Sequence, residues 1–352
     1  MHSTSPESTV QPELRDKTTN RSIKIGPNAG IFAVFIVLFV LLWVTTPTFR
    51  QVEALQNLAE QVAMNTIIAV GMTFVIITAG IDLSVGSIQG LVGVVTALTL
   101  MDPTLVSRFG SGAMVLAVLA GFFTGAAVGL LNGTAISKLR MQPFIVTLAT
   151  MWAIRGLADV ITNGSPIGTL SPGKPMAAAR NALLQNKFTA IGMGYIGPIP
   201  LSALVALLVV FVAHIILSRT VFGRQVYAIG GNREAARLSG INVNKTLLLV
   251  YILSGTLAGV AAIILMSRLV SGQPTAGQGY ELYAIAAVVV GGTSLFGGVG
   301  NVVGSAIGAL IMGLIGMGLD LNGISSFWQE IVTGSIILVA VYADEVLRRR
   351  KG

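Results

Sequence analysis

The chain has 352 residues, of which 53% are hydrophobic and 10% are charged, and its formal net charge is +8. Soluble globular chains carry about 25% charged residues, so this composition excludes an ordinary soluble domain. It predicts an all-α membrane protein that crosses the bilayer several times. The sequence has no cysteine and two histidines, His2 and His214. Disulfides and thiol catalysis are therefore excluded, and we expect neither a metal site nor a catalytic residue in this chain.

The organisation of the chain follows from the positions of its apolar segments. Residues 1–28 are polar and lack the apolar stretch of a signal peptide, so we expect a disordered cytoplasmic tail. Residues 29–347 form the expected transmembrane domain, and residues 348–352 form a basic cytoplasmic C-terminus. The domain contains about ten apolar segments that we predict as transmembrane helices. They lie at about 30–46, 62–80, 84–101, 113–137, 144–162, 199–217, 246–270, 282–296, 300–319 and 328–346.

Basic residues indicate how the chain is oriented. They cluster in the N-terminal tail, at Lys138 and Arg140, between Arg219 and Lys245, and at residues 348–351. Ten spans place all four clusters on one side, which the positive-inside rule assigns to the cytoplasm. Both termini are then cytoplasmic. The positive charge suits anionic lipid headgroups on that face, so we expect a membrane-lipid partner and no nucleic acid.

Two connecting loops stand out by length. The loop at about 163–198 is expected to be external, and the loop at about 218–245 is expected to be cytoplasmic.

The number of spans has an alternative. Eight spans satisfy the same charge rule if the Gly-rich segments 282–296 and 300–319 are re-entrant. The sequence therefore predicts eight to ten spans, with ten favoured.

Two stretches in the two halves of the chain show a weak similarity to each other, which we call the sequence echo. The stretch "AGIDLSVGSIQGLVGVV" from Ala79 resembles "GGTSLFGGVGNVVGSAI" from Gly291. Paired Gly-interrupted helices in two halves are typical of transporters near their solute pathway. Gly-rich membrane helices also look alike by composition alone. Both interpretations stay open on the sequence.

Several polar residues lie within or beside the apolar segments. Asp82, with Ser84 close by, could line a solute pathway at a broken helix, because ionisable groups in a membrane are costly. Asp82 could equally be an N-cap that accepts the free amides of the next helix, and we favour the cap. Asn65, Thr66 and Asn132 could face a polar cavity or form hydrogen bonds between helices.

Two further patterns bear on charge and on nucleotide binding. Arg155 and Asp159 lie four residues apart on one predicted helix, so we expect them to neutralise each other. Gly168–Lys174 reads "GTLSPGK", which imitates a phosphate-binding loop. Pro175 follows where that motif needs Ser or Thr, and no strand and helix flank it. We therefore expect no ATP site in this chain.

The segment Gly231–Ile241, "GNREAARLSGI", is unusually charged for this chain. Asn232 is a suitable N-cap, and Gly240 is a typical residue at which a helix stops. The intervening two turns carry three charged residues and two alanines, namely Arg233, Glu234, Ala235, Ala236 and Arg237. The small alanines would allow a partner to approach closely, and the charges would orient the contact. The alternative is an ordinary solvated loop helix.

This segment and several others carry a resemblance to a known family. Glu234, Ala235, Ala236 and Gly240 match the coupling motif of ATP-binding-cassette importer permeases. Longer stretches, from about Leu55 to the C-terminal end, resemble the ribose-type monosaccharide permeases. They are "GIDLSVGS" (Gly80–Ser87), "TNGSP" (Thr162–Pro166), "FGRQVYAIGGNREAARLSGINV" (Phe222–Val243) and "QPTAGQGYELYAIAAVVVGGTSLFGG" (Gln273–Gly298).

The resemblance implies a multi-subunit importer. Its members have about ten helices per chain and resemble the vitamin-B12-type (type II) importer fold. Two permease chains, identical or different, would form the pore in a bacterial inner membrane. An ATPase subunit would bind ATP and Mg²⁺ and dock on the helix at Asn232–Gly240. A periplasmic or lipid-anchored sugar-binding protein would deliver a pentose or hexose, and Arg180, Lys187 and Arg268 could contact it.

Two other function classes compete with this interpretation. A stand-alone secondary transporter of a small polar solute would need ion-coupling carboxylates, for which Asp82 and Asp159 are the candidates. It would also leave the charged cytoplasmic helix without a role. A membrane enzyme would need a polar catalytic cluster, and the sequence shows none.

Overall fold

The computed structural model describes residues 28–168 and 187–349. The first part contains α1 (Ala29–Thr45), the short 3-10 helix η1 (Pro47–Arg50), α2 (Val52–Ile77), α3 (Val85–Met101), α4 (Pro103–Phe109), α5 (Gly112–Ser137) and α6 (Pro143–Thr162). In the second part, residues 187–193 are helical. They are followed by α8 (Leu201–Arg219), α9 (Val221–Gly231), α10 (Arg233–Leu238), α11 (Val243–Leu269), α12 (Tyr280–Val290), α13 (Val302–Leu321) and α14 (Ser326–Arg349).

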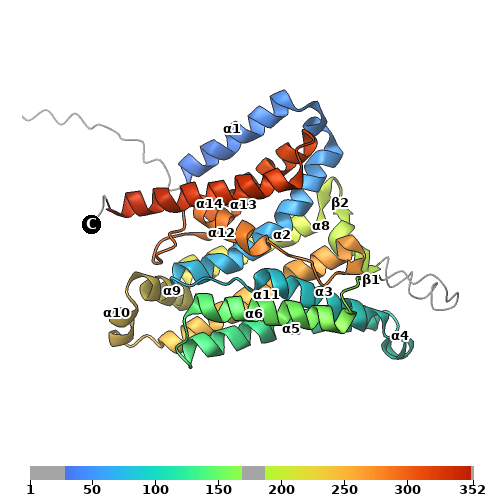
Figure 1. The fold of residues 1–352 in the computed structure, drawn as a ribbon, viewed down its shortest axis with the longest axis horizontal. Coiled ribbons are helices and arrows are strands. Elements are labelled where there is room, and N and C mark those ends of the chain that lie inside the picture. Colours follow the sequence, from blue (N-terminus) through green and yellow to red (C-terminus); the bar gives the residue numbers. More distant parts are fainter. Residues whose placement is uncertain (1–27, 169–186, 350–352) are drawn as a thin grey trace, which may run out of the picture.

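Short strand pairs complete the described fold. β1 (Ile167–Gly168) pairs antiparallel with β4 (Ser271–Gly272), and β2 (Tyr195–Ile196) pairs antiparallel with β3 (Ile199–Pro200). In Figure 1 these strands and α4 lie at one end of the helices. The start of α1, the end of α14 and α10 lie at the opposite end. The two ends of the transmembrane domain thus lie on the same side, as an even number of crossings requires.

Each of the ten apolar segments predicted from the sequence coincides with a helix, which confirms an all-α, multi-pass membrane protein. Within the described residues, seven helices are long and apolar enough to cross a membrane: α2, α5, α6, α8, α11, α13 and α14. α3 and α4 meet at a 60° bend and would together make an eighth span. The total of ten crossings, and the vitamin-B12-type fold, stay predictions.

The predicted span at 282–296 is wrong in length. α12 has 11 residues and ends at Val290, because the chain turns at Gly291 and Gly292. A helix of that length is about 16 Å long, roughly half of the hydrocarbon core. α1 is also apolar and shorter than a full span, at 17 residues.

α11 lies at the centre of the helix packing, where it contacts α5, α2 and α3. α11 and α5 approach backbone to backbone, and a Cβ added to Gly255 would lie 2.4 Å from the carbonyl oxygen of Gly125. Such close approach is typical of membrane helices, whose association depends on van der Waals packing. Large apolar side chains on the outer helices, such as Trp152 and Leu338, are exposed and suit contact with lipid.

Two irregular segments interrupt the helices, and we call them the first break (residues 78–84) and the second break (residues 291–301). The first lies between α2 and α3, and the second between α12 and α13. The breaks touch each other, because a Cβ added to Gly297 would lie 2.9 Å from the Cβ of Ala79. Beside this contact, the N–H of Gly298 donates to the carbonyl oxygen of Ile77, the last residue of α2, at 2.9 Å. Each of the two similar stretches of the sequence echo, from Ala79 and from Gly291, forms a break followed by the start of a helix, α3 in the first and α13 in the second.

Candidate functional site

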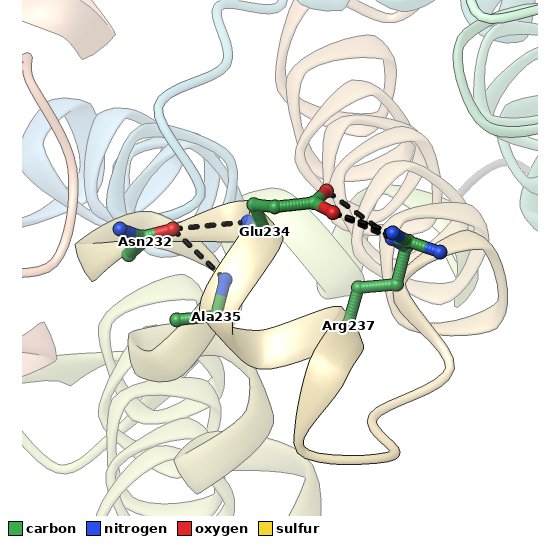
Figure 2. Close-up of polar contacts among 4 residues, drawn as sticks. All are labelled: Asn232, Glu234, Ala235 and Arg237. Carbon is green, nitrogen blue, oxygen red and sulfur yellow. Dashed lines mark hydrogen bonds and ion pairs between the residues drawn. The ribbon is translucent and has the colours of Figure 1, made fainter.

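α10 is the charged segment that the sequence singled out, and it projects at the end of the molecule that also holds the end of α14 (Figure 1). Its first turn is capped by Asn232, whose Oδ1 accepts from the backbone N–H of Glu234 at 3.0 Å and of Ala235 at 2.9 Å (Figure 2). These bonds satisfy two amides that have no partner inside the helix. The predicted N-cap is confirmed.

The end of α10 is equally well defined. Gly240 has a φ of +82°, a conformation that side chains rarely adopt. The N–H of Gly240 donates to the carbonyl of Arg237 at 3.0 Å, and that of Ile241 donates to the carbonyl of Ala236 at 3.1 Å. This pair of bonds is the Schellman motif, in which glycine ends a helix. The predicted stop at Gly240 is confirmed.

The two alanines of α10 do not share one face, which corrects the sequence-based prediction. Ala236 is buried against Ile229 and Val243, so it anchors α10 on the chain itself. Ala235 is exposed. Leu238, which the sequence analysis did not single out, is 76% exposed and is the large apolar side chain on the outer surface of α10.

The charged residues of α10 face outward. Arg237 donates to the carboxylate of Glu234, with Nη2 2.5 Å from Oε1 and Nε 3.1 Å from Oε2 (Figure 2). This bond lowers the pKa of Glu234 and raises that of Arg237. Both side chains are about two-thirds exposed, at 66% and 64%. An exposed pair contributes little to stability, so its charges can exchange partners at little cost. Arg233 is also exposed.

Three of the five residues predicted for a pathway meet in the interior. Asp82 Oδ1 accepts from the hydroxyl of Ser84 at 2.6 Å and from its N–H at 3.0 Å. Asp82 Oδ2 accepts from the hydroxyl of Ser254 at 2.8 Å, and Asn132 Nδ2 donates to Ser84 Oγ at 2.8 Å. This interior network joins the first break to α5 and α11. All four side chains are almost fully buried.

The N-cap assigned to Asp82 is wrong. α3 begins at Val85, and the residue before it is Ser84, so Asp82 stands too early to cap the amides of the helix. Its oxygens bind the hydroxyl and N–H of Ser84 and the hydroxyl of Ser254 instead. Asp82 therefore holds the first break against α11.

Asn65 and Thr66 lie apart from that network, on α2. Asn65 is half-buried. Thr66 lines a cavity of about 210 Å³ between α2, α8 and α13, whose other lining residues are apolar. These two residues therefore face different surroundings from the three in the interior.

Arg268, predicted to contact an external binding protein, is engaged within the chain. Its Nε lies 3.0 Å from Glu60 Oε2, and its Nη2 donates to Asn57 Oδ1 at 3.3 Å. The hydroxyl of Tyr195 donates to Glu60 Oε1 at 2.5 Å. The hydrogen bond to Glu60 raises the pKa of Tyr195. Arg268 thus ties α11 to α2 and, through Glu60, to the β2–β3 hairpin.

Of the other two residues predicted to contact a binding protein, Lys187 is described by the structure and Arg180 is not. Lys187 is exposed at the start of the helical segment 187–193. The next residue, Phe188, accepts from the hydroxyl of Ser267 near the end of α11 that leads into β4, which places this segment at the strand-bearing end. Arg180 lies outside the described residues, as does Lys174 of the rejected phosphate-loop pattern. A role of Lys187 in docking stays a prediction.

The expected pairing of Arg155 with Asp159 is not formed among the described residues. Arg155 Nη1 donates to the carbonyl oxygens of Pro274 at 2.5 Å and Ala276 at 2.8 Å. The guanidinium is therefore held by the irregular loop that leads into α12. Glu281, at the start of α12, and Asp159 both act electrostatically on it, although Asp159 forms no ion pair with it.

Some residues of the site were missed because their partners are distant in sequence. Glu60 and Ser254 are polar residues in apolar helices, and that contrast could have flagged both. Leu238 could not be found without knowing which side of α10 faces the chain. The sequence analysis placed residues 221–231 in a loop, whereas they form α9, an amphipathic helix that packs on α8, α10, α11 and α2.

Comparisons with known proteins show the family of the chain. The family model described as branched-chain amino acid transport system, permease component, matches residues 54–341. The ribose import permease protein RbsC of Bacillus subtilis (strain 168) is 45% identical over 324 residues, which cover 91% of this chain and 92% of the relative. The xylose transport system permease protein XylH of Escherichia coli (strain K12) is 36% identical over 380 residues, 94% of each chain. No solved structure matches the chain.

Proposed function

The chain belongs to the family of branched-chain amino acid transport system permease components, and we propose that it is the membrane-spanning subunit of an ATP-driven monosaccharide importer. Relatives at 45% and 36% identity are named as ribose import and xylose transport permeases, and both are covered almost end to end. The proposed solute is accordingly a ribose-like pentose or a hexose, moved into the cytoplasm.

The exposed, charged surface of α10 is the observation that supports this proposal most strongly. The helix is capped at both ends, anchored by Ala236 and otherwise exposed, with Leu238 and three charged residues on its outer surface. A helix that is rigid, polar and too short to span the membrane suits docking in a groove of a soluble partner. The proposed partner is an ABC ATPase subunit, which would supply ATP and Mg²⁺, with no nucleotide bound by this chain.

The assembly around this chain follows from the same premise. A second permease chain, identical or different, would complete the pore, and an external sugar-binding protein, periplasmic or lipid-anchored, would deliver the solute. The end that carries α10 would be cytoplasmic, with both termini, in a bacterial inner membrane. Lys187 lies on the opposite side and is the described residue that we retain as a contact for the binding protein.

The interior residues are divided by their exposure. Asp82, Ser84 and Asn132 have no exposed surface, so we assign them to holding the first break rather than to touching the solute. Asn65 is half-buried and Thr66 lines a cavity, so these two are the retained candidates for lining the passage. Both lie on α2.

The test is to purify the tagged chain from its native membrane and to measure the ATPase activity that co-purifies. Glu234→Arg places three positive charges together on α10, so we expect the retained ATPase to fall by about tenfold or more. Glu53→Arg, on the exposed first turn of α2 at the other end of the molecule, is the matched control and should retain it.

Two results would contradict the proposal. One is equal ATPase retention by the wild-type chain and Glu234→Arg. The other is uptake of radiolabelled ribose by the chain alone in proteoliposomes, driven by a proton or sodium gradient without ATP. The second result would establish a secondary transporter in place of an importer subunit.

A further inference from the structure

In the last turn of α9, Gly230 meets the body of the molecule through its backbone, beside the buried side chain of Ile229. A Cβ added to Gly230 would lie 1.7 Å from the carbonyl oxygen of Ile77 and 2.5 Å from the amide nitrogen of Gly298. Those two atoms are themselves joined by the hydrogen bond from Gly298 to Ile77. We call this three-way contact of Gly230, Ile77 and Gly298 the junction.

The junction joins the second break to the residue that directly precedes the first break. Ile77 is the last residue of α2, directly before the first break, and Gly298 lies within the second break. The first break contains Asp82 and Ser84, which the interior network ties to α11 and α5. A backbone that lacks helical hydrogen bonds can change direction more easily than a helix can. The junction thus contacts the parts of the chain best suited to bend.

α9 is attached to the body along its whole length. Phe222, in its first turn, stacks on Phe74 of α2, with ring centroids 6.1 Å apart. The hydroxyl of Tyr227 donates to the carbonyl of Gly300, in the second break, at 2.7 Å. Gly230 makes the junction in the last turn. Figure 1 shows α9 lying between α10 and the end of α2.

α9 and α10 are also joined closely to each other. The N–H of Asn232 donates to the carbonyl of Ala228 at 3.1 Å, so α9 continues into the capping residue of α10. Ala236 packs on Ile229, one residue before Gly230. A displacement of α10 therefore has a short path to the junction, with one residue between the two helices.

We propose that Gly230 is a positioning residue that passes the movement of α10 to both helix breaks. This inference rests on the proposed function, because the movement would come from the ATPase docked on α10. A backbone-to-backbone contact has no side-chain torsions that could absorb a displacement, so α9 cannot shift without moving Ile77 and Gly298. The glycine is required because any side chain would separate α9 from the two breaks.

Neighbouring glycines provide a matched pair of variants. Gly230→Ala inserts a Cβ into the junction, whereas a Cβ on Gly231 meets nothing within 4 Å. Both changes replace glycine by alanine in the last turn of the same helix, so their effects on helix propensity are alike. A difference in transport between the two variants therefore reports on the contact of Gly230 with Ile77 and Gly298.

The experiment uses the chain purified with its ATPase and reconstituted in proteoliposomes with the co-purified binding protein. ATP hydrolysis and uptake of radiolabelled ribose are measured together. For Gly230→Ala we expect the ATPase to stay bound and the ribose moved per ATP to fall by about tenfold. Gly231→Ala should stay within about twofold of the wild type. Equal ratios for the two variants would overturn the proposal.

A second, less disruptive variant tests the proposal if the Gly230→Ala chain does not assemble with its ATPase. Tyr227→Phe removes the hydrogen bond to Gly300 without adding an atom, and we expect the ribose moved per ATP to fall by about threefold. An unchanged ratio in an assembled Tyr227→Phe complex would then overturn the proposal. A wild-type chain that retains no ATPase would instead refute the proposed function, and the inference with it.

Discussion

The two ends of this molecule use ion pairs in opposite ways. At the α10 end, Glu234 and Arg237 pair with both side chains about two-thirds exposed. At the strand-bearing end, Arg268 and Glu60 pair with side-chain exposures of 27% and 6%, and Tyr195 also donates to the carboxylate. The first pair leaves its charges available to a partner, and the second fixes the fold. Charge alone therefore does not identify a docking surface.

The predicted contact of Arg268 with a binding protein shows the consequence. An arginine near the end of a span looks free in the sequence, because its partner Glu60 lies 208 positions away. In the structure its guanidinium is shared between Glu60 and Asn57. Its positive charge is therefore compensated within the chain and is less available to pair with another protein.

The largest expected effect comes from breaking the buried pair. Glu60→Leu leaves Arg268 without its counter-charge and Tyr195 without its acceptor, so we expect the free energy of unfolding in nanodiscs to fall by about 2 kcal/mol. Glu53→Leu, on the exposed first turn of the same helix, is the control and should change it by less than about 0.5 kcal/mol.

A double variant sharpens this comparison. Glu60→Leu combined with Arg268→Met removes both charges, and it should recover most of the stability lost by Glu60→Leu alone. If Glu60→Leu matches Glu53→Leu, the pair does not hold the strand-bearing end, and Arg268 would again be a candidate for docking.

A smaller and more local effect is expected at α10. Asn232→Ala removes the cap from the N–H groups of Glu234 and Ala235, which should destabilise the helix by about 1 kcal/mol. Amide hydrogen exchange within residues 235–238 should then be about fivefold faster, because that energy corresponds to such a ratio. The free energy of global unfolding should be unchanged, because Ala236 is the one residue of α10 that is buried against the rest of the chain.

Asn244→Ala is the matched control for that measurement, because Asn244 is an exposed asparagine in the first turn of α11. It should leave exchange in α10 unaltered. Equal exchange in Asn232→Ala and the wild type would show that the body of the chain, rather than the cap, keeps α10 folded.

Local features of the sequence predicted local structure well. The apolar runs gave the positions of the helices, and Asn232 and Gly240 gave the two ends of α10, because caps depend on residues two to five positions apart. The length of α12 was overestimated because the predicted span was carried across Gly291 and Gly292 to Leu295 and Phe296, whereas the two glycines end the helix.

Features that depend on distant partners were not predictable in this way. Ala235 and Ala236 are equivalent in the sequence, and only the positions of Ile229 and Val243 decide that Ala236 is buried. Asp82 meets Ser254, which lies 172 positions away, so its role as an interhelical acceptor could not be separated from an N-cap. The junction likewise joins α9 to residues from both halves of the chain.

The central claim is that an ATPase docks on α10, and a site-directed cross-link tests it most directly. The chain has no cysteine, so Leu238→Cys gives one attachment point for a benzophenone on the exposed face of α10. In a purified complex that imports ribose, the account predicts a photoproduct with the ATPase subunit from Leu238→Cys and none from Lys187→Cys at the opposite end. An active complex in which Leu238→Cys gives no ATPase adduct, or Lys187→Cys gives one, would contradict it.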